Sequence, residues 1–318
     1  DQHLNILLAT FFTYDLWKED LFSPVSLSSK LEEKRVTDPY FYTSNVLSMG
    51  SLFTEGDHLF LDKTHALATN ALHYLNKNIE ELERKLDASM VVYRDFDSTT
   101  DLNELLHKLG FIKINMPESC IMGDLAWNTK EEYLATLSSR SRRHFNKEIA
   151  PYESMFDVSF LQSPSKEQLE DFYQLYKNVK NNNNALNTFI YPKGLFTKMA
   201  SSPLWEFIVL HLKQCVSEKE PQKPVGVMFC YKNMDYSYVP NLIGMDYRYT
   251  KEFQVYRQLL YQTIKRAKEL QFEKIDFGMT ASFEKKKVGA TVIPKYSYVK
   301  AKDNYSLEAI GIIQNEEN

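Results

Sequence analysis

The sequence predicts an α/β protein with two similar domains, each a mixed, mainly antiparallel sheet flanked by helices. Its 318 residues, 43% of them hydrophobic, suit one large domain or two of ordinary size. The second half alternates strand and helix patterns around three strands in a row, which favours a mixed sheet over a doubly wound parallel one. The first half repeats the closing part of that order. We therefore expect domains at 1–125 and 126–318, the first of them degenerate or structural.

Hydrophobic periodicity assigns three helices and three strands to the first half and leaves 20–50 irregular. The expected helices cover 2–19, 64–87 and 99–110. The expected strands cover 58–62, 90–96 and 111–116. The helix at 64–87 has the clearest pattern, because its apolar residues step by three and four and form one stripe. The residues of this stripe are Leu72, Leu75, Ile79, Leu82 and Leu86.

The second half opens with a helix pair or one bent helix at 130–153, which Pro151 is expected to end. Further helical patterns cover 166–180, 192–200 and 253–270. Strand patterns cover 156–162, 205–214, 225–245, 272–278, 291–301 and 304–312. Of these, 225–245 is expected to form a hairpin whose turn is 233–235.

Composition and cysteine placement exclude several classes of protein. The formal net charge of -4 argues against a general nucleic-acid coat protein. Cys120, Cys215 and Cys230 lie far apart without a C-x-x-C motif, which predicts neither a metal site nor a disulfide framework and suits a reducing cytoplasm. No apolar run reaches the roughly 20 residues of a membrane helix. The chain begins with Asp rather than Met, which is consistent with a further domain upstream of residue 1.

Residues 244–262, GMDYRYTKEFQVYRQLLYQ, have the pattern of a strand end, a polar turn and an amphipathic helix. Many acyl-transfer enzymes place a glycine-rich loop at such a junction, because glycine lets the backbone approach a phosphate that the helix N-terminus attracts. This turn contains no glycine. Arg257 and Lys251 can add charge-assisted bonds to a phosphate, whereas Tyr256 would crowd it.

Three stretches of the second half carry a resemblance to a known family. YLATLSSRSRRHFNKE resembles the arginine-rich helix that opens the acyltransferase domain of the Fem-like branch of the GNAT superfamily. KPVGVMFCYKNMDYSYVPNLIGMDYRY is similar to that branch's central hairpin. LLYQTIKRAKELQFEKIDFGMTASFEKKKVGA resembles its signature, in which a strand ending Asp-Phe-Gly precedes a lysine, here Lys285, and Gly-Ala. The resemblance covers about 125–300; over 1–120 it is architectural, since Fem-like proteins carry two GNAT-like domains.

The resemblance implies a GNAT-type mechanism and a set of site residues. The donor carbonyl would lie where the strand with NLIGM splays from the strand with KIDFG, a backbone N–H would stabilise the oxyanion, and a base would take the amine proton. The catalytic candidates are Asp276, Asp246 and Tyr247. The candidates for binding an acyl-CoA donor are Lys251, Tyr256, Arg257 and Lys285. The substrate-binding candidates are Asn241, a polar residue in an apolar strand, and Arg140.

Each candidate also has an ordinary structural interpretation. The aspartates can cap a helix or pair with a cation, Tyr247 can pack, and the lysines and arginines can be solvated charges. Three functions therefore stay open. The first is an acyl-CoA-dependent N-acyltransferase acting on a small or cell-wall-precursor amine. The second is a Fem-type peptidyltransferase that uses aminoacyl-tRNA, which a basic groove would favour. The third is a non-catalytic binding module, which a gap filled by Tyr247, Tyr256 or Phe277 would favour.

Overall fold

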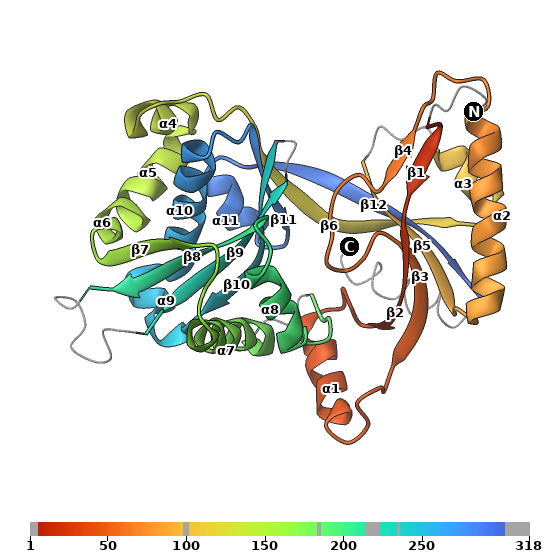
Figure 1. Cartoon of the computed structure of the whole chain (residues 1–318), viewed down its shortest axis with the longest axis horizontal. Helices are drawn as coiled ribbons and strands as arrows, with labels where there is room; N and C mark the ends of the chain where they lie inside the picture. Colours follow the sequence, from red (N-terminus) through yellow and green to blue (C-terminus); the bar gives the residue numbers. More distant parts are fainter. Residues whose placement is uncertain (1–5, 98–101, 183–185, 214–222, 234–235, 303–318) are drawn as a thin grey trace. The chain divides into compact units, whose positions relative to one another are not determined.

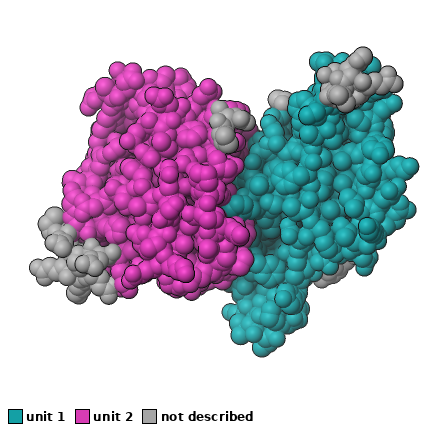
Figure 2. Space-filling view, in the orientation of Figure 1, with its two compact units in different colours: residues 1–117, 184–189, 294–318 teal, residues 118–183, 190–293 magenta. Residues whose placement is uncertain are grey.

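The computed structural model describes residues 6–97, 102–182, 186–213, 223–233 and 236–302, and shows a mixed α/β fold of helices and mostly antiparallel strands (Figure 1). The chain divides into two compact units (Figure 2). Unit 1 comprises 1–117, 184–189 and 294–318, and unit 2 comprises 118–183 and 190–293.

This division differs from the contiguous one expected from sequence, because distant segments return to unit 1. The C-terminal strand pairs antiparallel with the strand at Met90–Phe96 and so completes the sheet of unit 1. Asn187 is buried among charged side chains of unit 1 and donates to Asp20 over 2.7 Å. No local pattern in the sequence predicts the pairing of β12 with β5 or the contact between Asn187 and Asp20.

In unit 1 the hydrogen-bonded strand order is β2-β3-β5-β12, and β1 pairs separately with β4. The strands are β1 Leu8–Thr10, β2 Phe12–Lys18, β3 Thr43–Met49, β4 Leu59–Leu61, β5 Met90–Phe96 and β12 Thr291–Ala301. The helices are α1 Val25–Arg35, α2 Ala68–Leu86 and α3 Asn103–Lys108. The apolar stripe of α2 packs on this sheet, with Leu72 and Ile79 buried in one cluster with Val91 and Tyr93.

Several sequence predictions for this unit are confirmed and two are wrong. The strands at 58–62, 90–96 and 111–116 and the helices at 64–87 and 99–110 are present, with shifted ends. The described part of 2–19 is not a helix but β1 and β2. Its Thr, Phe and Tyr residues suit a strand, and β3 supplies the pairing partner. The segment 20–50 is not irregular, since it contains α1 and β3.

Unit 2 has the strand order β6-β11-β10-β9-β8-β7. The strands are β6 Ile112–Met122, β7 Phe156–Leu161, β8 Trp205–Leu212, β9 Gly226–Asn233, β10 Ser237–Met245 and β11 Lys274–Met279. The helices are α4 Lys130–Thr136, α5 Ser139–Glu148, α6 Ala150–Glu153, α7 Lys166–Asn182, α8 Lys193–Ala200, α9 Tyr247–Phe253, α10 Val255–Glu269 and α11 Ser282–Lys287. β6 and β12 each carry residues of both units.

Two glycines let helices approach opposite faces of the unit 2 sheet, as Figure 1 shows for α7 and α10. A Cβ atom on Gly244 would lie 2.7 Å from the backbone nitrogen of Tyr176 in α7. A Cβ atom on Gly226 would lie 2.7 Å from Val255 in α10. The two helices enclose the neighbouring strands β9 and β10 between them, so these strands are held on both faces.

The elements expected in the described part of unit 2 are present, with two differences. Pro151 does not end the 130–153 helices; it lies in the first turn of α6, where its missing N–H costs no hydrogen bond. The helix expected at 253–270 is preceded by a separate short helix, α9, and Gln254 between them has a left-handed backbone with φ 56°. Most of the expected turn 233–235 and the expected strand 304–312 lie outside the described residues.

Candidate active site

The parallel strands β10 and β11 diverge soon after they meet. Among the described residues they pair at two positions only, Ser237 with Lys274 and Tyr238 with Ile275. Beyond these, β10 stays paired with β9, and β11 with β6. A gap therefore opens between the two strands toward their C-terminal ends, as expected for the strands with NLIGM and KIDFG.

Asn241 lies on the β10 side of this gap, at a β-bulge. Pro240 pairs with Cys230 and Leu242 with the preceding residue, Phe229, so Asn241 has no counterpart on β9. A bulge reorients a peptide out of the regular ladder and is frequent next to active sites. Pro240 was the available sequence signal, because proline inside a strand marks an edge or a bulge.

Asp276 lies on the β11 side of the gap, one residue beyond the last pair with β10. Its Oδ1 accepts a hydrogen bond from the Gly278 backbone N–H over 3.0 Å. This contact fixes the carboxylate at a second irregularity, where the β11–β6 register shifts between Asp276 and Gly278. Asn241 and Asp276 thus flank one gap from its two sides.

Lys285 does not present its charge to solvent. It is 6% exposed, and its Nζ donates to the backbone carbonyl oxygens of Phe277 at 2.6 Å and Met279 at 2.7 Å. A third, longer bond of 3.2 Å goes to Gly278, whose φ of 66° suits glycine. These contacts make Lys285 a brace for the end of β11. That role differs from the phosphate ligand expected from sequence.

Arg257 is held by carboxylates at the start of α10. Its Nε lies 2.8 Å from Glu284 Oε2, and its Nη1 lies 3.5 Å from Glu148 Oε2 and also bonds to Gln254. Partial burial raises the pKa of Glu284, but hydrogen bonds from Arg257 and Lys287 outweigh it and bring the pKa to about 2. Two carboxylates, those of Glu148 and Glu284, therefore lie beside Arg257 at the start of α10.

His144 joins the same cluster from α5. Its Nε2 lies 3.9 Å from Glu284 Oε2. Burial, with the positive charges of Lys287 and Arg257, lowers the pKa of His144, so the imidazole is neutral near pH 7. We call Arg257, Glu148, Glu284, His144 and Lys287 the α10 cluster. No signal in the sequence links these residues, because they come from three separate helices.

The remaining expected donor-binding residues, Tyr256 and Lys251, and the expected substrate-binding residue Arg140 are dispersed. Tyr256 packs against the apolar core of unit 2, and this burial raises the pKa of its phenol. Lys251 is exposed on α9, and Arg140 is exposed on α5. The structure therefore does not bring these three residues together in one phosphate site.

Asp246 and Tyr247 lie beyond the gap, at the end of β10. Asp246 caps α9, with its Oδ1 accepting from the Arg248 backbone N–H at 3.0 Å. Burial raises the pKa of Asp246, but the Arg248 guanidinium 2.6 Å away more than offsets it, so the pKa lies below its usual value. Tyr247 is 39% exposed, and partial burial raises the pKa of its phenol.

One buried polar group of unit 2 was missed by the sequence interpretation. Glu206 on β8 is fully buried and lies 2.8 Å from Arg266 Nη2, while Tyr238 donates to its other oxygen over 2.7 Å. This group ties α10 to the sheet at the closed end of the gap. Its only sequence sign is a glutamate inside the apolar run WEFIVLHL.

The described part of the chain has neither a metal-binding cluster nor a membrane-spanning helix. It contains no group of three or more His, Cys, Asp or Glu side chains placed to hold a metal ion. Among the same residues, no helix combines the length and apolar character needed to cross a bilayer.

One family model matches part of unit 2. Residues 139–286 match the family model described as an acetyltransferase (GNAT) domain. No curated protein sequence matches the chain.

Three solved structures share the fold. FemX has a TM-score of 0.54 at 15% identity, covering 84% of this chain and 83% of its own. The C-terminal domain of a putative lysylphosphatidylglycerol synthetase from Agrobacterium fabrum has a TM-score of 0.51 at 14% identity, covering 83% and 80%. A tandem GNAT protein from the clavulanic acid biosynthesis pathway has a TM-score of 0.50 at 8% identity, covering 81% and 78%. Residues 139–286 thus match a GNAT acetyltransferase domain, and the chain shares its fold with FemX and with a tandem GNAT protein.

Proposed function

We propose that this protein transfers an acyl group from an activated ester or thioester to an amine, with the reacting carbonyl in the gap between β10 and β11. The observation that carries the proposal is the two-residue pairing of these strands, followed by the bulge at Asn241 and the carboxylate of Asp276 on opposite sides. A gap of this kind positions donor and acceptor, and positioning alone can supply much of the rate enhancement.

The proposed reaction proceeds by direct attack. The acceptor nitrogen attacks the donor carbonyl carbon, and a backbone N–H at the β10 bulge stabilises the oxyanion that forms. The ester or thioester bond then breaks. Asp276, directly or through a water, takes the proton that the amine loses. Tyr247 is the proposed proton donor to the leaving group, because its phenol is partly exposed and is protonated near neutral pH. Asp246, which caps α9, is given no chemical role.

The α10 cluster disfavours a CoA pyrophosphate at the start of α10, which leaves an aminoacyl ester of tRNA as the first candidate donor. A CoA pyrophosphate at the start of α10 would approach the carboxylates of Glu148 and Glu284, and Arg257 would have to leave them. Lys285 would have to leave its three carbonyl partners. The resemblance to Fem-type peptidyltransferases supports the same donor. The proposed acceptor is the amine of a small molecule or a cell-wall precursor.

Acyl-CoA is the second candidate donor. It is favoured by the family model, which describes acetyltransferases, and by the exposed Lys251 one turn before α10. A reducing, cytoplasmic setting is part of both proposals; among the described residues, the buried Cys120 and Cys230 form no disulfide. Cys215 lies outside the described residues.

The test is a comparison of donors on the full chain. A radiolabelled pool of aminoacyl-tRNAs, acetyl-CoA and a medium-chain acyl-CoA are each titrated calorimetrically, and transfer of label to amine acceptors is then followed. We expect saturable binding and transfer with aminoacyl-tRNA. Asp276→Asn should bind the same donor and lose most of the transfer.

The other outcomes separate the alternatives. Saturable binding of a thioester that is lost in Arg257→Ala would overturn the tRNA donor and establish acyl-CoA. Binding of no donor, together with no label transfer, would overturn acyl transfer itself and leave a GNAT-like binding module.

A further inference from the structure

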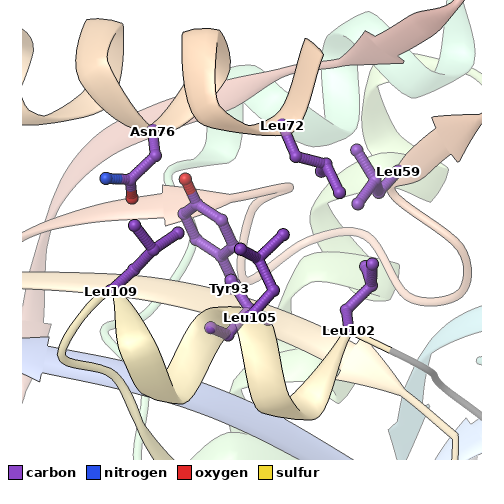
Figure 3. A pocket seen from close by; sticks show the side chains of 8 residues that line it. Leu59, Leu72, Asn76, Tyr93, Leu102, Leu105 and Leu109 are labelled. Carbon is purple, nitrogen blue, oxygen red and sulfur yellow. The ribbon is translucent and has the colours of Figure 1, made fainter. Parts of the chain in front are cut away.

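Unit 1 contains a small cavity between α2, β5 and α3, far in sequence from the GNAT domain (Figure 3). Leucines from β4, α2 and the ends and body of α3 form most of its wall. Two polar residues complete it, Asn76 of α2 and Tyr93 of β5. The cavity belongs to no part of the proposed acyl-transfer site.

Both polar residues are buried, and each has an atom without a partner. Tyr93 is 2% exposed and Asn76 is 5% exposed. Among the protein groups that the structure describes, neither the Tyr93 hydroxyl nor Asn76 Oδ1 has a hydrogen-bond partner. Burying such groups unpaired is costly, and native proteins rarely do so without a bound molecule or water. Burial also raises the pKa of Tyr93, so the hydroxyl keeps its proton and is a donor.

The orientation of the Asn76 amide is determined by its other contact. Its Nδ2 donates to Glu80 Oε1 over 3.1 Å, and the same Glu80 oxygen lies 3.2 Å from Lys300 Nζ. Rotating the amide by half a turn would bring its oxygen against a carboxylate. Oδ1 therefore remains the atom that faces Tyr93, and Figure 3 shows the two oxygens pointing toward one another.

The size of the cavity limits what it can hold. The space open to the centre of a water molecule is about 10 Å³, close to the minimum that one water needs. Purely apolar cavities stay dry, whereas a cavity with converging polar groups holds water. Here an acceptor and a donor converge within a leucine wall.

We propose that this cavity is a binding site for one hydroxyl oxygen, which accepts a hydrogen bond from Tyr93 and donates one to Asn76 Oδ1. A water molecule supplies this chemistry and fits the space, and it links α2 to β5 inside unit 1. The site is independent of the acyl-transfer proposal, and neither depends on the other.

The first arm of the test detects bound water by NMR in the full chain with labelled leucine methyl groups. We expect cross-relaxation between a long-lived water and the methyl groups of Leu72 and Leu106, and its loss in Tyr93→Phe. Tyr298→Phe is the matched control, because Tyr298 is buried in the same cluster but donates to Asn103 Oδ1 over 3.1 Å. It should keep the water signal.

The second arm is a titration with 2-propanol, which is larger than the space in the cavity, followed by the shifts of the same methyl groups. Saturable shifts that are absent in Tyr93→Phe would overturn the single-water site. A water signal without such shifts would support it. Neither signal, together with an unchanged or higher melting temperature for Tyr93→Phe, would overturn the site, since removing a hydroxyl that has no ligand relieves an unpaired group.

Discussion

Among the described residues, β3 and β5 in unit 1 and β10 and β11 in unit 2 are parallel pairs whose connections contain a helix, and the two pairs differ in how they end. In unit 1, β3 and β5 pair at three positions, the last joining Ser48 to Val92, and β3 ends at the next residue. In unit 2, β10 and β11 pair at two positions, and β10 then continues as far as Met245. The paired strands therefore stay together to the end of β3 in unit 1, whereas in unit 2 they separate and leave a gap.

The surroundings of the two pairs explain the difference. Beyond its parallel pair, β5 runs on beside β12, and buried residues such as Tyr93 and Phe111 fill the interior of unit 1. In unit 2, β9 and β6 draw β10 and β11 to opposite sides, and Lys285 holds the end of β11. A gap needs strands that extend past their pairing and have other partners. Only unit 2 meets both conditions among the described residues.

The largest effect is expected from the fully buried carboxylate of Glu206 in unit 2. Glu206→Ala removes the partner of the Arg266 guanidinium, which is 17% exposed, and leaves the buried Tyr238 hydroxyl without its acceptor, so it should lower the free energy of unfolding by about 3 kcal/mol. Chemical denaturation measures this. Glu269→Ala is the control, because Glu269 contacts the same arginine from the surface at 62% exposure, and it should change stability by less than about 0.5 kcal/mol.

Hydrogen exchange on Glu206→Ala then tests the separation of the two regions. We expect the amides of β8 to β11 to lose protection while those of β3 and β5 keep theirs. Equal loss in both units would show that they unfold as one body, and the comparison would no longer describe independent regions.

The next effect concerns the chemistry of the open pair. Asp276→Asn removes the proposed base while preserving the side chain's shape, and should lower the turnover number about 100-fold with little change in melting temperature. Steady-state kinetics with the proposed aminoacyl-tRNA donor measures the turnover number. Asp87→Asn, an exposed residue of unit 1, is the control. Wild-type turnover in Asp276→Asn would remove the base from the mechanism and leave the gap as a positioning device.

A smaller effect is expected where α7 contacts β10. Gly244→Ala places a methyl group 2.7 Å from the Tyr176 backbone, and because backbone cannot yield easily, unfolding should become easier by about 1–3 kcal/mol. Thermal unfolding is the measurement. Gly194→Ala in α8 has open space around it, so it should not destabilise. If Gly244→Ala is as stable as the wild type, α7 does not brace β10 closely.

The smallest effect is the dependence of each unit on acid. Glu284 in unit 2 and Glu32 in unit 1 both have a pKa of about 2, against 4.5 for a free glutamate. A lowered pKa contributes stability that is present above pH 4.5 and is lost as the pH falls toward 2. Glu284→Gln should flatten this loss for unit 2 only, and Glu32→Gln for unit 1 only. Hydrogen exchange at several pH values measures the stability of each unit. A change in unit 1 caused by Glu284→Gln, or in unit 2 caused by Glu32→Gln, would contradict this prediction.

The local hydrophobic pattern was enough to predict helices and strands whose apolar side chains recur at regular spacing. The α2 stripe through Leu72 and Ile79 and the apolar run of β5 gave the correct element types, because burial on one face follows from period alone. The same logic failed for β2, because the apolar stretch at 2–19 fits the pattern of a helix as well as that of a strand. Short apolar runs are compatible with either structure, and the partner strand β3 decided between them.

The candidate site shows the same limit. The order of motifs led to the gap between β10 and β11 and to Asn241 and Asp276 beside it, since strand order follows from the family resemblance. It could not reveal that Arg257 and Lys285 already have partners. The partners of Arg257 come from α5 and α11, and those of Lys285 are backbone carbonyls, which no side-chain pattern records.

The sequence by itself therefore determined the mixed α/β class, most helices and strands, the GNAT character of residues 139–286 and the strands that border the gap. These follow from periodicity and from motifs read along the chain. Only the tertiary structure decided the membership of the units, the bulge beside Asn241, the carboxylates at the start of α10 and the cavity at Tyr93. Each of these depends on which distant groups meet, and a hydrogen bond or an ion pair forms by distance in space rather than by separation in sequence.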